Sequence, residues 1–222
     1  MTKKLVLFFT FGLMAINAFA QDGGYTRQKT WDAEINSMVE TDIRQSPPKN
    51  PVIFAGSSSV RMWKTINTDF PGLPFINRAF GGSEFEDLNY YATRIIVPYK
   101  PKKLFVYEGD NDVNSGKSAE RVLEDFKNFL EIVRPKLPKT KIYFISIKPS
   151  IARWKLYPEM DRANGLVREE ARKHKNVYYV DVASKMLGSD GKPLPDIFLG
   201  DNLHMNSKGY AIWREVIGKY VW

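Results

Sequence analysis

Short apolar runs alternate with helical patterns along most of this 222-residue chain, and no other feature constrains its fold as strongly. Five runs are rich in β-branched and aromatic residues and predict strands. They cover residues 51–56, 75–77, 103–109, 141–147 and 177–181. Strands that alternate with helices form a parallel sheet with helices on both faces, so the sequence predicts a three-layer α/β/α arrangement.

Between these runs, apolar residues recur at helical spacing. The clearest helix follows Ser118 and is ended by Pro135. Its apolar face consists of Val122, Phe126, Phe129, Leu130 and Val133. Weaker patterns predict three more helices, over residues 31–43, 84–96 and 159–174. Ser207 is expected to cap a last helix at the end of the chain.

Residues 1–20 have the pattern of a secretion signal peptide. Lys3 and Lys4 precede a mostly apolar stretch, and Ala18-Phe19-Ala20 supplies small residues around a cleavage site. The apolar stretch is shorter than the roughly 20 residues of a membrane-spanning helix, and an uncleaved anchor is the alternative. We expect cleavage after Ala20 and export to the periplasm or the cell exterior, which excludes stable membrane insertion. The expected mature chain has a helical extension over residues 21–50 and one domain over residues 51–222.

The composition excludes several kinds of site. The chain has no cysteine, so disulfides, thiolate nucleophiles and cysteine-bound metals are ruled out, and its two histidines cannot build a multi-histidine metal centre. His174 lies among basic residues near a predicted helix end, where a structural role is expected. The net charge of +8 is spread along the chain without interleaved aromatic residues, which favours a solvated surface over nucleic-acid binding. Attraction to anionic polysaccharide or to a membrane surface is the alternative.

Glycines and polar residues collect where the predicted strands end, which is where ligands bind in parallel sheets. The segments are 56–59 (GSSS), 81–83 (GGS), 109–112 (GDND) and, after a long irregular stretch, 201–204 (DNLH). Each segment alone is readily explained as a turn or a helix cap. Together they contain the alcohol, imidazole, carboxylate and amide groups that a serine hydrolase needs.

These segments resemble the four sequence blocks of the SGNH hydrolase superfamily, also called GDSL-like lipases and acylhydrolases. The matching stretches are IFAGSSSVRMW (53–63), NRAFGGSEFEDL (77–88), VYEGDNDV (106–113) and GDNLHMNSKGY (200–210). The resemblance implies an α/β fold, namely a three-layer α/β/α sandwich with a five-stranded parallel sheet of the flavodoxin-like type. It also implies carboxylic ester hydrolysis without a cofactor or a metal.

The resemblance assigns a role to each matching residue. Ser58 aligns with the nucleophile, His204 with the general base and Asp201 with the acid that orients it. The oxyanion hole is formed by Ser58, Gly82 and Asn111. Ser57 is a departure, because most members carry aspartate there. The residues themselves agree: a serine hydroxyl needs a neutral imidazole to remove its proton, and His204 is the only plausible one.

The other common serine-hydrolase arrangement is disfavoured. Its G-x-S-x-G nucleophile turn fails here, because Val60 occupies the final glycine position. Its acid is also normally distant from its histidine along the chain, unlike Asp201 and His204.

The sequence predicts an exported serine esterase that acts through an acyl-enzyme on short acyl groups, such as acetyl on carbohydrate. A lysophospholipase-like or lipase-like acylhydrolase, or a non-catalytic carbohydrate-binding protein on the same fold, is the alternative. The expected partner is a small-molecule or glycan ester, and the oligomeric state is left open. Specificity is expected from residues 149–157, with Trp63, Trp154 and Tyr157 as candidate pocket aromatics.

Overall fold

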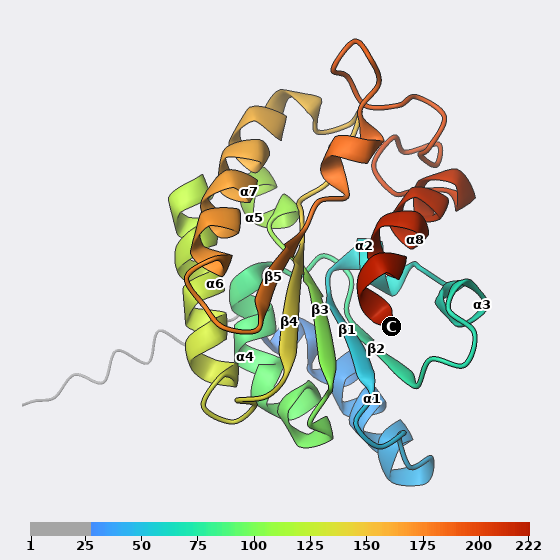
Figure 1. Ribbon diagram of the computed structural model, residues 1–222, viewed down its shortest axis with the longest axis vertical. Helices are drawn as coiled ribbons and strands as arrows, with labels where there is room; N and C mark the ends of the chain where they lie inside the picture. The colour runs from blue at the N-terminus through green and yellow to red at the C-terminus, as the bar shows by residue number, and fades with distance from the viewer. Residues whose placement is uncertain (1–27) are drawn as a thin grey trace, which may run out of the picture.

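The computed structural model describes residues 28–222 and contains one five-stranded sheet (Figure 1). Its strands are β1 (Val52–Gly56), β2 (Phe75–Ala79), β3 (Lys103–Tyr107), β4 (Lys141–Ile145) and β5 (Val177–Val180). They lie in the order β2-β1-β3-β4-β5, and each neighbouring pair is parallel. This order confirms the predicted flavodoxin-like sheet. The expected signal peptide, residues 1–20, lies outside the described residues.

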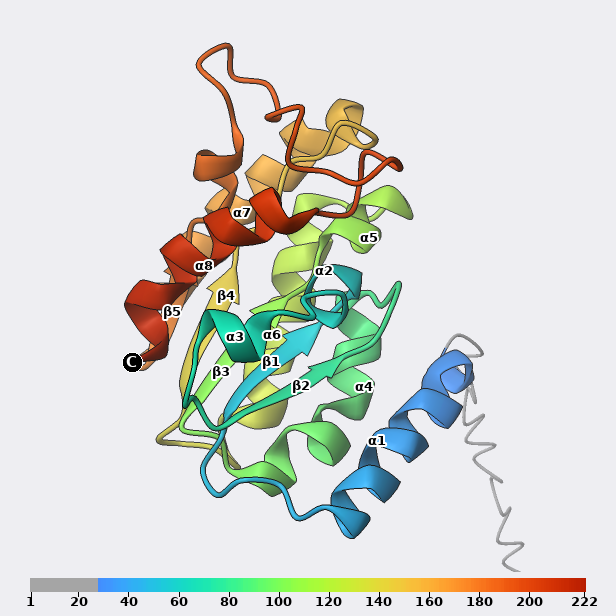
Figure 2. The same cartoon turned by 90° about the vertical axis from the view of Figure 1, so that its right-hand side faces the viewer.

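Helices cover both faces of the sheet, as Figures 1 and 2 show from two directions. One face carries α4 (Phe85–Ile95), α6 (Ala119–Val133) and α7 (Tyr157–Ala171), with α1 (Asp32–Arg44) packed against α4. The other face carries α2 (Ser58–Arg61), α3 (Ile66–Asp69) and α8 (Ser207–Val221). The remaining short elements are α5 (Asp110–Asn114), η1 (Gln28–Trp31), η2 (Val97–Tyr99), η3 (Trp154–Leu156) and η4 (Ala183–Met186). None of the helices within residues 28–222 is long and apolar enough to cross a membrane.

The predicted strands and helices are present, with shifted boundaries. β2 is longer than predicted because residues 77–79 pair with β1. β3 stops before its predicted end, since Gly109 turns the chain with a φ of 113°. α7 begins earlier than predicted, and Pro158 fits its first turn because the N–H that proline lacks has no helical partner there.

Polar side chains cap two of the long helices, and one cap differs from the prediction. Ser118 caps α6, since its side chain accepts a hydrogen bond from the Arg121 N–H at 3.2 Å. Ser207 was wrong as the cap of α8, because it is already the first helical residue. Asn206 is the cap: its Oδ1 accepts from the N–H groups of Lys208 and Gly209, and its amide also donates to the Phe198 carbonyl.

Alternate residues of the strands fill two separate cores. Phe54, Phe105 and Tyr143 point toward α8, while their chain neighbours point toward α4, α6 and α7. Phe54, Phe105, Tyr143 and Tyr178 pair in register across four strands, with successive ring centroids 4.7, 4.6 and 4.9 Å apart. This stacked row fixes the alignment of the strands, and with it the positions of the residues that follow them.

Gly56, the last residue of β1, forms the turn into Ser57 and Ser58. Its φ of 127° lies in the region that favours glycine. A Cβ atom there would lie 2.0 Å from the Tyr107 carbonyl oxygen of the neighbouring strand. The same carbonyl accepts a hydrogen bond from the Ser57 N–H at 3.1 Å. Any side chain at position 56 would therefore push apart β1 and β3 directly beneath Ser58.

We predict that Gly56→Ala lowers the free energy of unfolding by at least about 3 kcal/mol, because it adds a backbone clash to the strain of a positive φ. Gly72→Ala is the matched control, since Gly72 also has a positive φ but a Cβ there meets nothing within 4 Å. The control should lose no more than about 1–2 kcal/mol. Urea denaturation measures both, and equal losses would contradict the steric argument.

Candidate active site

The carboxyl ends of the strands meet at one edge of the sheet, the upper end in Figure 1. The strand order reverses between β1 and β3, and open α/β sheets bind their ligands outside such a point. Ser58 follows β1 and Asn111 follows β3, so both lie at this reversal. Gly82 follows β2, and the segment with His204 crosses the same edge before α8.

Three predicted residues form a continuous hydrogen-bonded series. His204 Nε2 lies 3.0 Å from Ser58 Oγ, and His204 Nδ1 lies 2.6 Å from Asp201 Oδ2. With the Nδ1 proton donated to Asp201, Nε2 is the lone-pair nitrogen and accepts from the Ser58 hydroxyl. The structure therefore places the alcohol, the imidazole and the carboxylate in the order that nucleophilic catalysis requires.

Asp201 is held in place by the loop that carries it. Its Oδ1 accepts the backbone N–H groups of Leu203 and His204, both at 2.9 Å, while Oδ2 contacts the imidazole. The hydrogen bond from His204 is the largest cause that lowers the pKa of Asp201 to about 2. The carboxylate is thus ionised over the working pH range, where it fixes the imidazole tautomer and favours the imidazolium.

Two backbone groups predicted for the oxyanion hole lie on turns. Ser58 is the first residue of α2, so its N–H has no partner within that helix. Gly82 has a φ of 78° and is exposed at the carboxyl edge of the sheet. The Trp31 indole N–H donates to the Gly81 carbonyl at 2.9 Å, which ties this turn to the helix at the start of the described chain.

Asn111, the third predicted donor, is fixed on both sides of its amide. Its nitrogen donates to Ser57 Oγ at 2.7 Å and to the Ser83 carbonyl at 2.9 Å, while its oxygen accepts from Arg153 at 3.0 Å. The structure brings Asn111 beside the nucleophile, yet both of its N–H bonds are used within the protein. Ser57, which replaces the usual aspartate, thus acts as an acceptor that orients this amide.

A buried carboxyl group, that of Glu108, contacts the serine whose carbonyl accepts from Asn111. Glu108 Oε1 lies 2.7 Å from Ser83 Oγ, and the Ser83 carbonyl accepts from Asn111. Burial, followed by the charge of Asp112, raises the pKa of Glu108 well above its ordinary value. Burial thus favours the protonated form of Glu108, while the Ser83 hydroxyl, which donates to Glu108 Oε1, opposes this shift.

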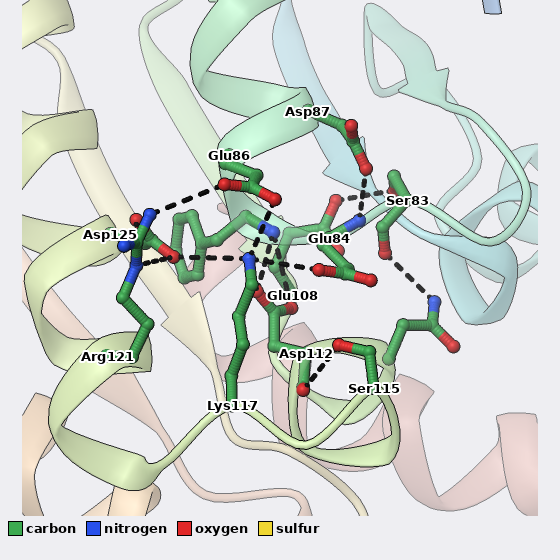
Figure 3. A network of polar contacts seen from close by, with 12 residues as sticks. Ser83, Glu84, Glu86, Asp87, Glu108, Asp112, Ser115, Lys117, Arg121 and Asp125 are labelled. Atoms are coloured by element: carbon green, nitrogen blue, oxygen red, sulfur yellow. Dashed lines mark hydrogen bonds and ion pairs between the residues drawn. The ribbon is translucent and has the colours of Figure 1, made fainter. Parts of the chain in front are cut away.

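Lys117 joins the surrounding carboxylates into one network, shown in Figure 3. Its ammonium lies 2.9 to 3.5 Å from four carboxylates, those of Glu84, Glu86, Asp112 and Asp125. Asp112 also accepts the Phe85 N–H, and burial raises its pKa to about 6 although Lys117 opposes the shift. The network fixes the start of α4 to α5 and α6, and so holds the Gly82–Ser83 turn.

Sequence reasoning missed the cations that support the site. Arg153 donates to the Asp110 carbonyl at 3.1 Å and to Asn111, and it comes from the 149–157 segment that was expected to set specificity. Lys148 is fully buried and donates to the Leu203 carbonyl at 2.9 Å, and this burial lowers its pKa. A lysine directly after an apolar strand was the signal available for Lys148.

The candidate pocket aromatics differ in burial and position. Trp63 was wrong as a pocket residue, because it is 1% exposed in the core, where its indole N–H donates to Asp69. Trp154 is half-buried and stacks on Tyr157 with ring centroids 5.1 Å apart, at the end of the 149–157 segment.

His174 lies away from the Ser58 site. Its Nε2 is 2.9 Å from a Glu170 oxygen, near the opposite edge of the sheet. Within residues 28–222, no group of three or more His, Asp or Glu side chains is arranged to hold a metal ion.

The chain has known relatives of the expected kind. A family model described as the GDSL-like Lipase/Acylhydrolase family matches residues 53–212. Platelet-activating factor acetylhydrolase IB subunit alpha1 of Pongo abelii is 25% identical over 189 residues, which cover 81% of this chain and 79% of the relative.

Solved structures show the same fold at low identity. A GDSL-like lipase of Bacteroides thetaiotaomicron superposes with a TM-score of 0.71 and 18% identity, covering 85% of this chain and 97% of the other. A mutant of an acetyl-xylooligosaccharide esterase from Geobacillus Stearmophilus gives a TM-score of 0.62 with 13% identity, covering 80% and 96%.

The raised pKa of Glu108 predicts a specific pH dependence of stability. Above its ordinary pKa of 4.5 the unfolded chain ionises this carboxyl more readily than the folded chain, so unfolding releases a proton and stability falls as pH rises. This fall continues until Glu108 also ionises in the folded protein. Glu108→Gln should remove a slope of up to about 1.4 kcal/mol per pH unit over that range.

Urea denaturation of wild type and Glu108→Gln at several pH values between about 5 and 8 measures this slope. The exposed Glu124, changed to Gln, is the control and should leave the slope of wild type unchanged. Parallel curves for wild type and Glu108→Gln would show that folding does not raise the pKa of Glu108.

Proposed function

This chain belongs to the GDSL-like lipase/acylhydrolase family, whose members hydrolyse ester bonds, and on that premise we propose an exported esterase that releases short acyl groups through an acyl-enzyme on Ser58. The observation that carries the proposal is the 3.0 Å contact between Ser58 Oγ and His204 Nε2, with Asp201 on the far side of the ring. The proposed substrate is a small-molecule or glycan ester, such as an acetylated carbohydrate.

In the first step, Ser58 Oγ attacks the ester carbonyl carbon while His204 Nε2 takes the hydroxyl proton. The imidazolium that forms is stabilised by Asp201, whose carboxylate is ionised at any working pH. The bond from the carbon to the alcohol oxygen of the ester then breaks, and that oxygen takes the proton from Nε2. The acyl group stays on Ser58. Water attacks this acyl-enzyme with the same proton transfers and releases the carboxylic acid.

The negative oxygen of the intermediate is stabilised by the N–H groups of Ser58, Gly82 and Asn111. For Asn111, the N–H that donates to Ser57 Oγ is the one that can be shared with substrate, because a serine hydroxyl is uncharged and can rotate to other partners. The N–H toward Ser83 stays in place and keeps the amide aimed. One such donor is worth roughly 3–4 kcal/mol in the barrier.

The names of two similar proteins support a substrate with a short acyl group. The mammalian relative is named an acetylhydrolase and the Geobacillus protein an acetyl-xylooligosaccharide esterase. Both names describe removal of a two-carbon acyl group from different alcohols. Acetyl transfer to Ser58 is therefore the proposal, with the alcohol side of the ester left for experiment.

Exposed apolar side chains favour the second candidate, a lysophospholipase-like or lipase-like acylhydrolase. Ile151 and Leu199 are 38% and 41% exposed. Both lie beside the His204 loop, since the Ala152 N–H donates to the Asn202 carbonyl and the Leu199 N–H to the His204 carbonyl. Such side chains suit a longer acyl chain. A carbohydrate-binding protein without turnover is disfavoured, because mere binding does not need the Ser58–His204 contact.

Export rests on the signal-peptide pattern of residues 1–20, with cleavage after Ala20. A periplasmic or extracellular enzyme would meet acylated glycans and lipids rather than cytosolic thioesters. Location and substrate class are therefore proposed together.

Ser58→Ala is expected to lower kcat/KM on p-nitrophenyl acetate by at least roughly a thousandfold, because the attacking oxygen is lost. His204→Ala should have a similar effect, and Asp201→Ala a smaller one. His174→Ala is the matched histidine control and should leave the rate unchanged. Full activity of Ser58→Ala, or failure of a fluorophosphonate probe to label wild type, would contradict the acyl-enzyme.

A series of p-nitrophenyl esters should give its highest kcat/KM at acetate or butyrate, because the proposed substrate carries a short acyl group. Acetylated oligosaccharides test the alcohol side in the same assay. A maximum at eight carbons or longer would favour the lipase-like candidate and would leave the role of Ser58 untouched.

A further inference from the structure

The loops that lead into the strands gather positive charge at the amino edge of the sheet, the lower end in Figure 1. The loops before β3 and β4 cover residues 96–102 and 134–140, and neither contains an aspartate or a glutamate. Their lysines are Lys100, Lys102, Lys136 and Lys139. All four side chains are exposed.

These lysines line one groove of about 470 Å³ between the two loops. The other lining residues are Asn50, Pro101, Leu137, Pro138 and Thr140, so no acidic side chain faces the groove. None of the four lysines forms an ion pair with an acidic residue in the described part of the chain. Their charge is therefore available to a partner.

We propose that this lysine groove, formed by Lys100, Lys102, Lys136 and Lys139, binds an anionic polysaccharide chain carrying uronic-acid carboxylates or sulfates. Lysines are point charges on flexible stems, and they suit anionic groups whose spacing varies along a polymer. The exposed Asn50 in the lining supplies an uncharged amide for sugar hydroxyls.

Two other polyanions fit the groove less well. A membrane surface is flat, and none of the large exposed hydrophobic side chains of the described chain lies in the groove to enter a bilayer. A nucleic acid would be expected to meet arginines and aromatic rings, and the lining contains neither. Both remain as arms of the test.

The groove and the Ser58 site lie at opposite edges of the same sheet, so both can be occupied at once. A polysaccharide in the groove would hold the protein with its active site turned away from the bound stretch. Hydrolysis of a small soluble ester should therefore be independent of groove binding, which separates this proposal from the proposed esterase activity.

The test compares two triple variants that remove the same charge. The groove variant carries Lys102→Gln, Lys136→Gln and Lys139→Gln, and the control carries Lys64→Gln, Lys185→Gln and Lys192→Gln at exposed positions outside the groove. Polygalacturonate and heparin are the anionic probes, and dextran is the neutral one. Affinities are measured by biolayer interferometry at low and at near-physiological ionic strength.

Wild type and the control are expected to bind both anionic probes and to ignore dextran, while the groove variant binds roughly tenfold more weakly or not at all. All three proteins should hydrolyse p-nitrophenyl acetate at the same rate. Equal losses in the two variants would show that only net charge matters and would overturn the site. Tighter binding to phosphatidylglycerol vesicles or to duplex DNA than to polygalacturonate would overturn the choice of partner.

Discussion

The common direction of all five strands determines where everything else lies. Because each strand is parallel to its neighbours, every segment that leaves a strand emerges at one edge and every segment that enters a strand lies at the other. Ser58 and His204, which are 146 positions apart along the chain, meet at the first edge for this reason. The lysine groove occupies the second edge for the same reason. The chemistry and the proposed polymer contact are two consequences of one topological rule.

The support of the site is polar and buried rather than apolar. A buried carboxyl such as Glu108 is costly to ionise, which raises its pKa, and the Ser83 hydroxyl donates a hydrogen bond to it. The resulting series runs from Glu108 through Ser83 to Asn111 and ends at Ser57. A serine in place of the usual aspartate is consistent with this series, since an acceptor for the Asn111 amide is retained without adding another negative charge beside Asp110 and Asp112.

The fold and the residues of the Ser58–His204–Asp201 series could be predicted because short stretches of sequence indicate both. Runs of β-branched and aromatic residues predict strands wherever they occur, and Ser58, Asp201 and His204 lie in short recognisable segments. The residues that were missed depend on contacts between distant segments. Trp31 supports the Gly82 turn from 50 residues away, and nothing around Trp31 indicates that contact. Trp63 was misjudged because a sequence shows that an aromatic ring is near a motif but not which way the ring faces. The Ser207 error is of another kind, since Asn206 and Ser207 are both good caps and only geometry chooses between them.

The Arg153 contact links substrate selectivity to the rate of turnover, two properties that protein engineers usually treat as separate. Arg153 belongs to the 149–157 segment, from which specificity was expected, and it also holds the side-chain oxygen of Asn111. Diversifying that segment to accept new alcohols would also disturb the amide that we propose stabilises the tetrahedral intermediate. Libraries that keep Arg153 fixed should retain fast variants, whereas libraries that vary it would couple every gain in selectivity to a change in rate.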